Sequence, residues 1–146
     1  MTKSSRITTF SAVGIVLVLL VVFVYGVFHG WFDNGKFEVE QTLLSPSKQI
    51  AMIARRYDND ALGGLQYFVV VGDHAFSSAE LRHAYYYDGI VFRAGSPCLS
   101  IRWNGVHELT ITCSDHSIVA DDIAVQRRRV GETFVEYEGI PTKIRR

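Results

Sequence analysis

The chain has 146 residues, and its 15 Lys and Arg residues balance its 15 Asp and Glu residues, so the formal net charge at neutral pH is zero. This balance excludes the general attraction to nucleic acid that a strongly basic domain shows, so we expect no nucleic-acid partner. The length is sufficient for one domain and a separate anchoring segment.

An uncharged apolar segment lies close to the N-terminus. Between residues 7 and 32 there is no Asp, Glu, Lys or Arg, and the central sequence GIVLVLLVVFVYGVF is apolar on every helical face. A helix that rises about 1.5 Å per residue would cross a hydrocarbon core of about 30 Å over this length. We therefore expect residues 7 to 32 to form one transmembrane helix. A cleaved signal peptide is the alternative, but the residues that follow contain no convincing small-x-small cleavage site.

The charges on either side of this segment predict its orientation. Lys3 and Arg6 precede it, whereas the stretch from residue 33 to 40 is mainly acidic. Because positive residues remain on the cytoplasmic side, we expect residues 1 to 6 to lie in the cytoplasm and residues 36 to 140 to be exported.

Short strand-like runs fill the exported part, which ends in a basic tail from residue 141 to 146. KFEVEQTLL and QIAMIARRY flank the turn sequence SPSK, a pattern that predicts a hairpin. LQYFVVVG, GIVFRAG, CLSIRW, HELTITC, DIAVQRR and TFVEYEG are further runs of this kind between turn signals. We expect a mainly β (α+β) fold, a small antiparallel sheet or sandwich with one short helix.

The expected helix lies in SSAELRHAYYYD. Ser77 and Glu80 have capping-box spacing, and Leu81, Ala84 and Tyr85 fall on one helical face.

This segment also supplies the candidate binding surface. Tyrosine offers a large contact area at modest entropic cost, so we take Tyr85, Tyr86, Tyr87 and Arg82 as candidate contact residues. The alternative is that one or two of the tyrosines pack against the sheet.

Two cysteines and two histidines lie in CLSIRWNGVHELTITCSDH. The Asn104-Gly105 pair predicts a hairpin turn, which places His107 near the tip and Cys98 and Cys113 at the open end. His107 and Cys113 would then be roughly 20 Å apart, too far to bind one zinc ion. A partial set of ligands from Cys113 and His116, with or without Cys98, is a minor alternative, and we expect no metal.

The two cysteines form either a disulfide or two separate thiols. An oxidising compartment favours the disulfide. However, pairing the apolar faces of the two strands requires odd positions to oppose odd ones, so Cys98 and Cys113 would not be directly opposed. Only a bulge, or a bend at Pro97, would allow both the register and the bond.

No sequence motif identifies an enzyme. His74, His83 and Asp73 could form a small hydrolase or metal-dependent site, but they have no diagnostic spacing. We therefore assign no catalytic residue and no cofactor. The leading expectation is a membrane-anchored interaction module with an unidentified protein partner, either an envelope assembly component or an immunity-type protein; the alternative is the enzyme.

The chain also resembles a diffuse group of small, uncharacterised bacterial membrane-anchored or lipoprotein domains. The resemblance covers SPSKQIAMIARRYDNDALGGLQYFVVV and LSIRWNGVHELTITC, and this chain departs from the lipoprotein members because it has no lipidation cysteine after the anchor. It implies a bacterial inner-membrane setting and no site residue. The residues that carry this resemblance are Ser45, Pro46, Ala51, Arg56, Asp58, Ala61, Gly64, Val69, Val71, Trp103, Leu109 and Ile111.

Overall fold

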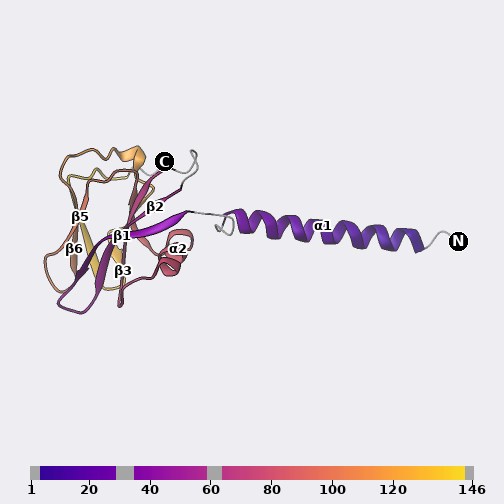
Figure 1. Cartoon of the computed structure of the whole chain (residues 1–146), viewed down its shortest axis with the longest axis horizontal. Helices are drawn as coiled ribbons and strands as arrows, with labels where there is room; N and C mark the ends of the chain where they lie inside the picture. The colour runs from indigo at the N-terminus through magenta and orange to yellow at the C-terminus, as the bar shows by residue number, and fades with distance from the viewer. Residues whose placement is uncertain (1–3, 29–34, 59–63, 144–146) are drawn as a thin grey trace. The chain divides into compact units, whose positions relative to one another are not determined.

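The computed structural model of the chain describes residues 4 to 28, 35 to 58 and 64 to 143, and within the first helix it describes the side chains of residues 13 to 27. The chain divides into two compact units, Met1–Asp33 and Asn34–Arg146. The first unit contains helix α1 (Ser4–Phe28) (Figure 1). The second contains, in order, β1 (Lys36–Leu44), β2 (Ile50–Tyr57), β3 (Gln66–Gly72), α2 (Ser78–Tyr86), β4 (Ile90–Ala94), β5 (Leu99–Trp103), β6 (Glu108–Cys113), the 3-10 turn η1 (Ala120–Asp122), β7 (Val125–Gln126), β8 (Arg129–Val130) and β9 (Thr133–Glu138).

Helix α1 covers most of the segment that is expected to span a membrane. Its large apolar side chains from Val13 to Val27 are each between 41% and 64% exposed. Within the described part of the chain, no helix has the length and hydropathy that a membrane span needs. Residues 29 to 32 of the expected span lie outside the described residues. Because the large apolar side chains between Val13 and Val27 are exposed, this part of α1 has an apolar surface.

The first sheet, sheet A, is antiparallel and has the strand order β1-β2-β3-β4-β7. The hairpin predicted around SPSK is confirmed as β1–β2. The Lys48 N–H donates to the Ser45 carbonyl oxygen at 3.0 Å, and Lys48 has a positive φ of 66°. β1 carries a bulge between Val39 and Gln41, where the register of the pair shifts by one residue.

The second sheet, sheet B, has the strand order β5-β6-β9-β8. Its β5–β6 hairpin has the register predicted from the apolar faces, with Ile101 opposite Ile111 and Trp103 opposite Leu109. This register places Cys113 opposite Leu99. The odd-to-odd pairing is therefore confirmed.

The expectation of a purely antiparallel sheet is wrong for sheet B, because β9 runs parallel to β6. The connection from residue 114 to 132 is longer than the dozen or so residues that a parallel crossover needs. It passes through η1 and β7, which pairs with β4 of sheet A, before β8 and β9 form the last hairpin. The strand expected over DIAVQRR is accordingly reduced to Val125–Gln126.

Sheet A is the middle of three layers. Residues alternate between the two faces of a strand, so β2 and β3 each contribute to two separate clusters. Ile53 and Val69 pack in one cluster with Ile111 of sheet B. Phe68 packs in the other cluster with Leu81 of α2. Both faces of the central strands are therefore buried, which explains why LQYFVVVG is an almost continuous apolar run.

Polar bonds connect the two sheets at several points. The Trp103 indole N–H of β5 donates to the Leu43 carbonyl oxygen of β1 at 3.3 Å. The Tyr137 hydroxyl of β9 donates to the Arg127 carbonyl oxygen beside β7. Burial raises the pKa of Tyr137, which keeps this hydroxyl protonated as a donor.

The beginning of the basic tail is bound to sheet A. The Lys143 backbone N–H donates to Gln126 Oε1 at 2.6 Å, and its ammonium group donates to the Ala124 carbonyl oxygen. Residues 144 to 146 lie outside the described residues.

Gly139, directly after β9, provides a test of the fold. Its φ is +67°, and a Cβ at this position would lie 2.3 Å from the Cys113 carbonyl oxygen. Gly131 also has a positive φ of +57°, but a Cβ there would meet nothing within 4 Å. We expect Gly131→Ala to lower the free energy of unfolding by about 1 kcal/mol through backbone strain alone, and Gly139→Ala to lower it further because of the clash. Chemical unfolding of the full chain measures both. Equal effects of the two substitutions would contradict the close approach at Gly139.

Candidate functional site

A cleft of about 370 Å³ opens where the edges of the two sheets meet. On the face of β2 that is directed toward sheet B, the apolar residue Ile53 is followed by the charged residue Arg55. On the same face of β3, the apolar residue Val69 is preceded by Tyr67, which has a polar hydroxyl. Arg55 and Tyr67 are register partners, so the apolar core ends at the same level on both strands. The cleft is lined by Glu40, Gln41, Ile53, Arg55, Tyr67, Pro97 and Leu99.

Arg55 lies at the centre of a charged cluster beside this cleft. Its NH2 group donates to Glu38 Oε2 at 2.6 Å, and its Nε lies 2.9 Å from Glu40 Oε1. The Tyr57 hydroxyl donates to Glu38 Oε1 at 2.7 Å. Hydrogen bonds from Arg55 and then Tyr57 lower the pKa of Glu38, and the same bond to Glu38 raises the pKa of Arg55. The cluster therefore joins two carboxylates to one guanidinium, and the charge of Lys36 also acts on Glu38.

The bulge in β1 determines where Glu40 lies. Val39 pairs with Ala54 and Gln41 pairs with Ile53, which leaves Glu40 without a register partner on β2. Bulges commonly redirect a side chain next to a functional site. Here the bulge lets Glu38 and Glu40 both reach Arg55.

Pro97 and Leu99 line the side of the cleft opposite β1, and a disulfide at the residue between them restrains their position. Cys98 and Cys113 are bonded, with their Cα atoms 5.0 Å apart. Cys98 precedes β5, and the chain bends at Pro97, so the bond forms although the strands keep their odd-to-odd register. The bend is one of the two solutions that the register problem allowed.

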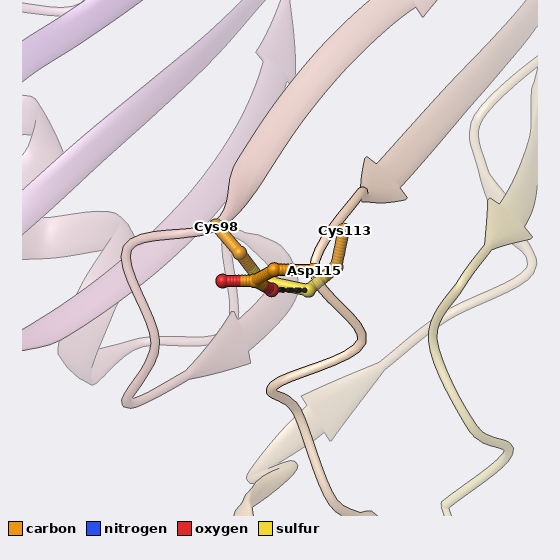
Figure 2. Close-up of side chains that lie close together, drawn as sticks. All are labelled: Cys98, Cys113 and Asp115. Atoms are coloured by element: carbon orange, nitrogen blue, oxygen red, sulfur yellow. Dashed lines mark hydrogen bonds between the residues drawn. A yellow bond between two sulfur atoms is a disulfide. The ribbon is translucent and has the colours of Figure 1, made fainter.

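Asp115 covers the disulfide on the Cys113 side. Figure 2 shows its side chain turned toward the sulfurs. The distance between Asp115 Oδ1 and Cys113 Sγ is 3.0 Å. A disulfide sulfur carries no proton, so this is a close contact and not a hydrogen bond donated by sulfur. The Ser117 backbone N–H donates to the same carboxylate at 3.0 Å and is the main cause that lowers the pKa of Asp115.

These three side chains also have the proximity of a metal site, because their ligand atoms lie within 4.8 Å of one another. Metal binding by cysteine requires free thiolates, whereas these two sulfurs are bonded to each other. In the disulfide state, Cys98, Cys113 and Asp115 therefore do not offer a metal site.

The predicted helix is present as α2, with the predicted cap. The Ser77 side chain accepts a hydrogen bond from the Glu80 backbone N–H, and the Glu80 carboxylate accepts one from the Ser77 backbone N–H. Leu81 and Ala84 are buried on the face toward sheet A.

The tyrosine run does not form one surface. The ring of Tyr85 packs 5.4 Å from the ring of Phe68 in the core beneath α2, and Tyr86 contacts Tyr85 at 5.1 Å. Tyr87 is 40% exposed, and Arg82 donates to a backbone carbonyl oxygen at 3.2 Å. Among the three tyrosines, Tyr87 is therefore the one best placed for contact with a partner.

His74 lies between two carboxylates at the start of α2. Its Nδ1 is 2.7 Å from Asp73 Oδ1, and its Nε2 is 2.9 Å from Glu80 Oε1. Ionised carboxylates only accept hydrogen bonds, so the arrangement satisfies both ring nitrogens when His74 is protonated. The bond to Asp73 and then the bond to Glu80 raise the pKa of His74. The Ser77 backbone N–H contributes most to lowering the pKa of Glu80, to about 2.

This geometry does not favour the enzyme alternative. A general base or a metal ligand needs an unprotonated ring nitrogen, and both nitrogens of His74 are already bound to carboxylates. The ring of His83 stacks on Tyr87 at 4.6 Å. The Ser77 hydroxyl donates to Glu80 at 2.7 Å as part of the helix cap, so it is not activated by a histidine.

Sequence reasoning missed the residues that line the cleft, above all Glu40, Arg55 and Tyr67. The available signal was a polar residue at the next inner position of two adjacent strands. Both strands were recognised, but their pairing was not, so the two polar positions could not be placed side by side.

Comparison of the chain with family models, with curated proteins and with solved structures gives no match.

The His74 cluster predicts a dependence of stability on pH. A raised pKa in the folded state stabilises the fold fully below the unfolded value of about 6.5, and this contribution is lost as pH rises through the folded pKa. We expect His74→Gln to lower the free energy of unfolding at pH 5 to 6, with a difference from wild type that shrinks as pH rises above about 6.5. Urea unfolding across this range measures the difference. A difference that stays constant with pH would show that His74 is not held as an imidazolium.

Asp115 predicts resistance of the disulfide to reduction. Its negative charge repels an attacking thiolate and destabilises a Cys113 thiolate as leaving group. We expect Asp115→Asn to be reduced by dithiothreitol roughly fivefold faster than wild type, because the amide keeps the bond from Ser117 without the charge. Asp121→Asn is the matched control, because it makes the same substitution at an exposed aspartate outside the disulfide contact. Alkylation of the released thiols over time gives the rates, and identical rates for the two variants would refute the protecting role.

Proposed function

We propose that this chain is a membrane-anchored binding module, which holds a small β-rich domain outside the bacterial inner membrane to capture a protein partner. In this proposal the domain is a component of an envelope assembly or an immunity-type protein that intercepts a toxin. The observation that carries it is the inter-sheet cleft, in which Glu40, Arg55 and Tyr67 converge beside apolar walls. A cleft at which several polar side chains converge is a candidate binding site.

The N-terminal segment supports the membrane anchor. Residues 7 to 32 contain no charged side chain, and the large apolar side chains between Val13 and Val27 are exposed. Exposure of apolar surface to water is unfavourable by about 25 cal/mol per Å², so lipid is the favourable surrounding for such a helix. Lys3 and Arg6 favour a cytoplasmic N-terminus.

The disulfide supports export of the domain. Disulfides persist in oxidising compartments and are rare where thiols are kept reduced. The Cys98–Cys113 bond therefore agrees with a domain on the outer side of the membrane. A tether on that side raises the effective concentration of the domain near partners in the envelope.

The enzyme remains the weaker alternative. Both ring nitrogens of His74, which a general base or a metal ligand would need free, lie within hydrogen-bond distance of carboxylates. Binding needs no such groups, so it accounts for the cleft without further assumptions.

Crosslinking in cells tests the proposal. The full-length protein would be expressed in a bacterial host and crosslinked, and the captured proteins would be identified by mass spectrometry. We expect a specific envelope protein, and we expect the double variant Glu40→Gln with Gln41→Ala to reduce its recovery by about tenfold, because both residues line the cleft. Tyr87→Ser tests the helix surface separately, and Asp121→Asn is the control.

Two results would count against the proposal. One is recovery of the same proteins in the same amounts with wild type, the cleft variant and Tyr87→Ser. The other is the finding of free Cys98 and Cys113 thiols by non-reducing peptide mapping of the same sample, which would contradict the exported location.

A further inference from the structure

We propose that the Cys98–Cys113 disulfide becomes a zinc site when it is reduced, with both thiolates and the Asp115 carboxylate as ligands of the ion. The disulfide is the resting, oxidised form of this site and excludes the metal. The inference goes beyond the proposed binding function, because it does not depend on the capture of a partner. It follows from the convergence of three ligand atoms, from the position of Asp115 and from the chemistry of the ligand set.

The three ligand atoms already lie together in the folded chain. Both Sγ atoms and a carboxylate oxygen of Asp115 lie within 4.8 Å of one another. Figure 2 shows the three side chains meeting at the open end of the β5–β6 hairpin. The Cα atoms of Cys98 and Cys113 are 5.0 Å apart, and β6 is held between β5 and β9. Two sulfurs bound to one zinc ion lie about 3.8 Å apart, a spacing that rotation of the two side chains reaches without movement of the strands.

Asp115 is held in the orientation that a metal ligand needs. Its Oδ1 lies 3.0 Å from Cys113 Sγ, but it gains no hydrogen bond there, because a disulfide sulfur carries no proton. The Ser117 backbone N–H donates to the same carboxylate at 3.0 Å and is the main cause that lowers the pKa of Asp115. Carboxylates that bind metals are commonly oriented by a hydrogen bond of this kind. The contact with sulfur is therefore explained by the reduced form, in which a cation lies between the carboxylate and the thiolates.

Two thiolates and one carboxylate are a ligand set for zinc. Zinc binds both cysteine sulfur and aspartate oxygen, whereas calcium and magnesium take oxygen ligands and copper(I) prefers soft ligands alone. Cys113 is buried, Cys98 is half-buried and Asp115 is exposed, so the ion can enter from the Asp115 side. Three protein ligands leave the fourth tetrahedral position to water.

His116 is not part of this ligand set, although it follows Cys113 by three residues. A Cβ at Gly139 would lie 3.2 Å from His116 Nδ1, so the imidazole ring lies against the backbone at Gly139. Among the described residues, the group of ligand atoms within 4.8 Å contains Asp115 in its place. The ligand pair on this side of the site is therefore Cys113-x-Asp115.

Formation of the site requires a reductant of the dithiol class. The dithiol transfers two electrons and two protons to the disulfide and becomes a disulfide itself, while Cys98 and Cys113 become thiols. Zinc then replaces the two thiol protons, which pass to water, because the thiolate is the form that binds the ion. Zinc and the disulfide exclude each other, since each uses both sulfurs.

Zinc titration of the full chain in lipid nanodiscs tests the inference. The protein would be titrated as the disulfide and, under nitrogen, after reduction by dithiothreitol and removal of the reductant, with a chromophoric chelator as competitor. We expect one zinc ion per reduced chain and no zinc bound by the disulfide form. We expect Asp115→Asn to bind zinc at least about tenfold more weakly, because loss of a partner even outside the ligand shell weakens metal binding by this factor. Asp121→Asn, at an exposed aspartate outside the cluster, is the matched control and binds as wild type.

Cobalt(II) in place of zinc identifies the ligands. Cobalt bound to thiolate has a strong near-ultraviolet absorption that oxygen ligands do not produce. We expect this absorption in the reduced wild type and in Asp121→Asn, at about half the intensity in Cys98→Ser, and not in the disulfide form. Circular dichroism of each sample verifies that the domain is folded.

Several outcomes would overturn the inference. Equal zinc affinity of the disulfide and reduced forms would show that the thiolates are not ligands. Equal affinities of Asp115→Asn and Asp121→Asn would show two neighbouring thiols that bind zinc without Asp115, and not the site proposed. A reduced chain that is folded and binds no zinc would exclude the site, and so would a chain that unfolds on reduction and does not refold when zinc is added.

Discussion

Burial of sheet A on both faces is the constraint on which the rest of the domain depends. Its central strands carry apolar side chains in both directions, so the sheet is stable in water only when both faces are covered. Sheet B covers one face through residues such as Ile111, and α2 covers the other through Leu81. The capping box at Ser77 and the inter-sheet bond from Tyr137 hold these two covers in place.

The cleft lies where the face of sheet A that is directed toward sheet B is no longer apolar. At Arg55 and Tyr67 the inner face of sheet A becomes polar, and the two sheets no longer need to stay in close contact. One lip carries the bulge of β1, and the other is fixed by the Cys98–Cys113 bond. The apolar core and the cleft are thus consecutive sections of the same inter-sheet space. The residues that line the cleft are held by paired strands and a disulfide, which favours a preformed geometry.

Local patterns predicted the elements of this fold better than its pairings. The β1–β2 hairpin, the capping box and the odd-to-odd register of β5 and β6 followed from turn residues and alternation, which act over a few positions. The parallel pairing of β6 with β9 depends on a connection from residue 114 to 132, and no local pattern specifies its path. The cleft was missed for the same reason, since Glu40, Arg55 and Tyr67 become neighbours only through pairing and a bulge. Of the predicted contact residues, Tyr85 packs against the core beneath α2, and this could not be foreseen before sheet A and α2 were placed together.

The position of β9 also affects the order in which the domain can assemble. Strands β1 to β4 are neighbours in both sequence and space, so most of sheet A can pair early, before the rest of the chain is placed. β9 is the last described strand, yet it lies between β6 and β8 inside sheet B. Sheet B therefore stays incomplete, with one backbone edge of β6 unpaired, until β9 is in place. During folding the domain therefore passes through a partly assembled state, and this is the stage at which it is most exposed to aggregation and to proteases.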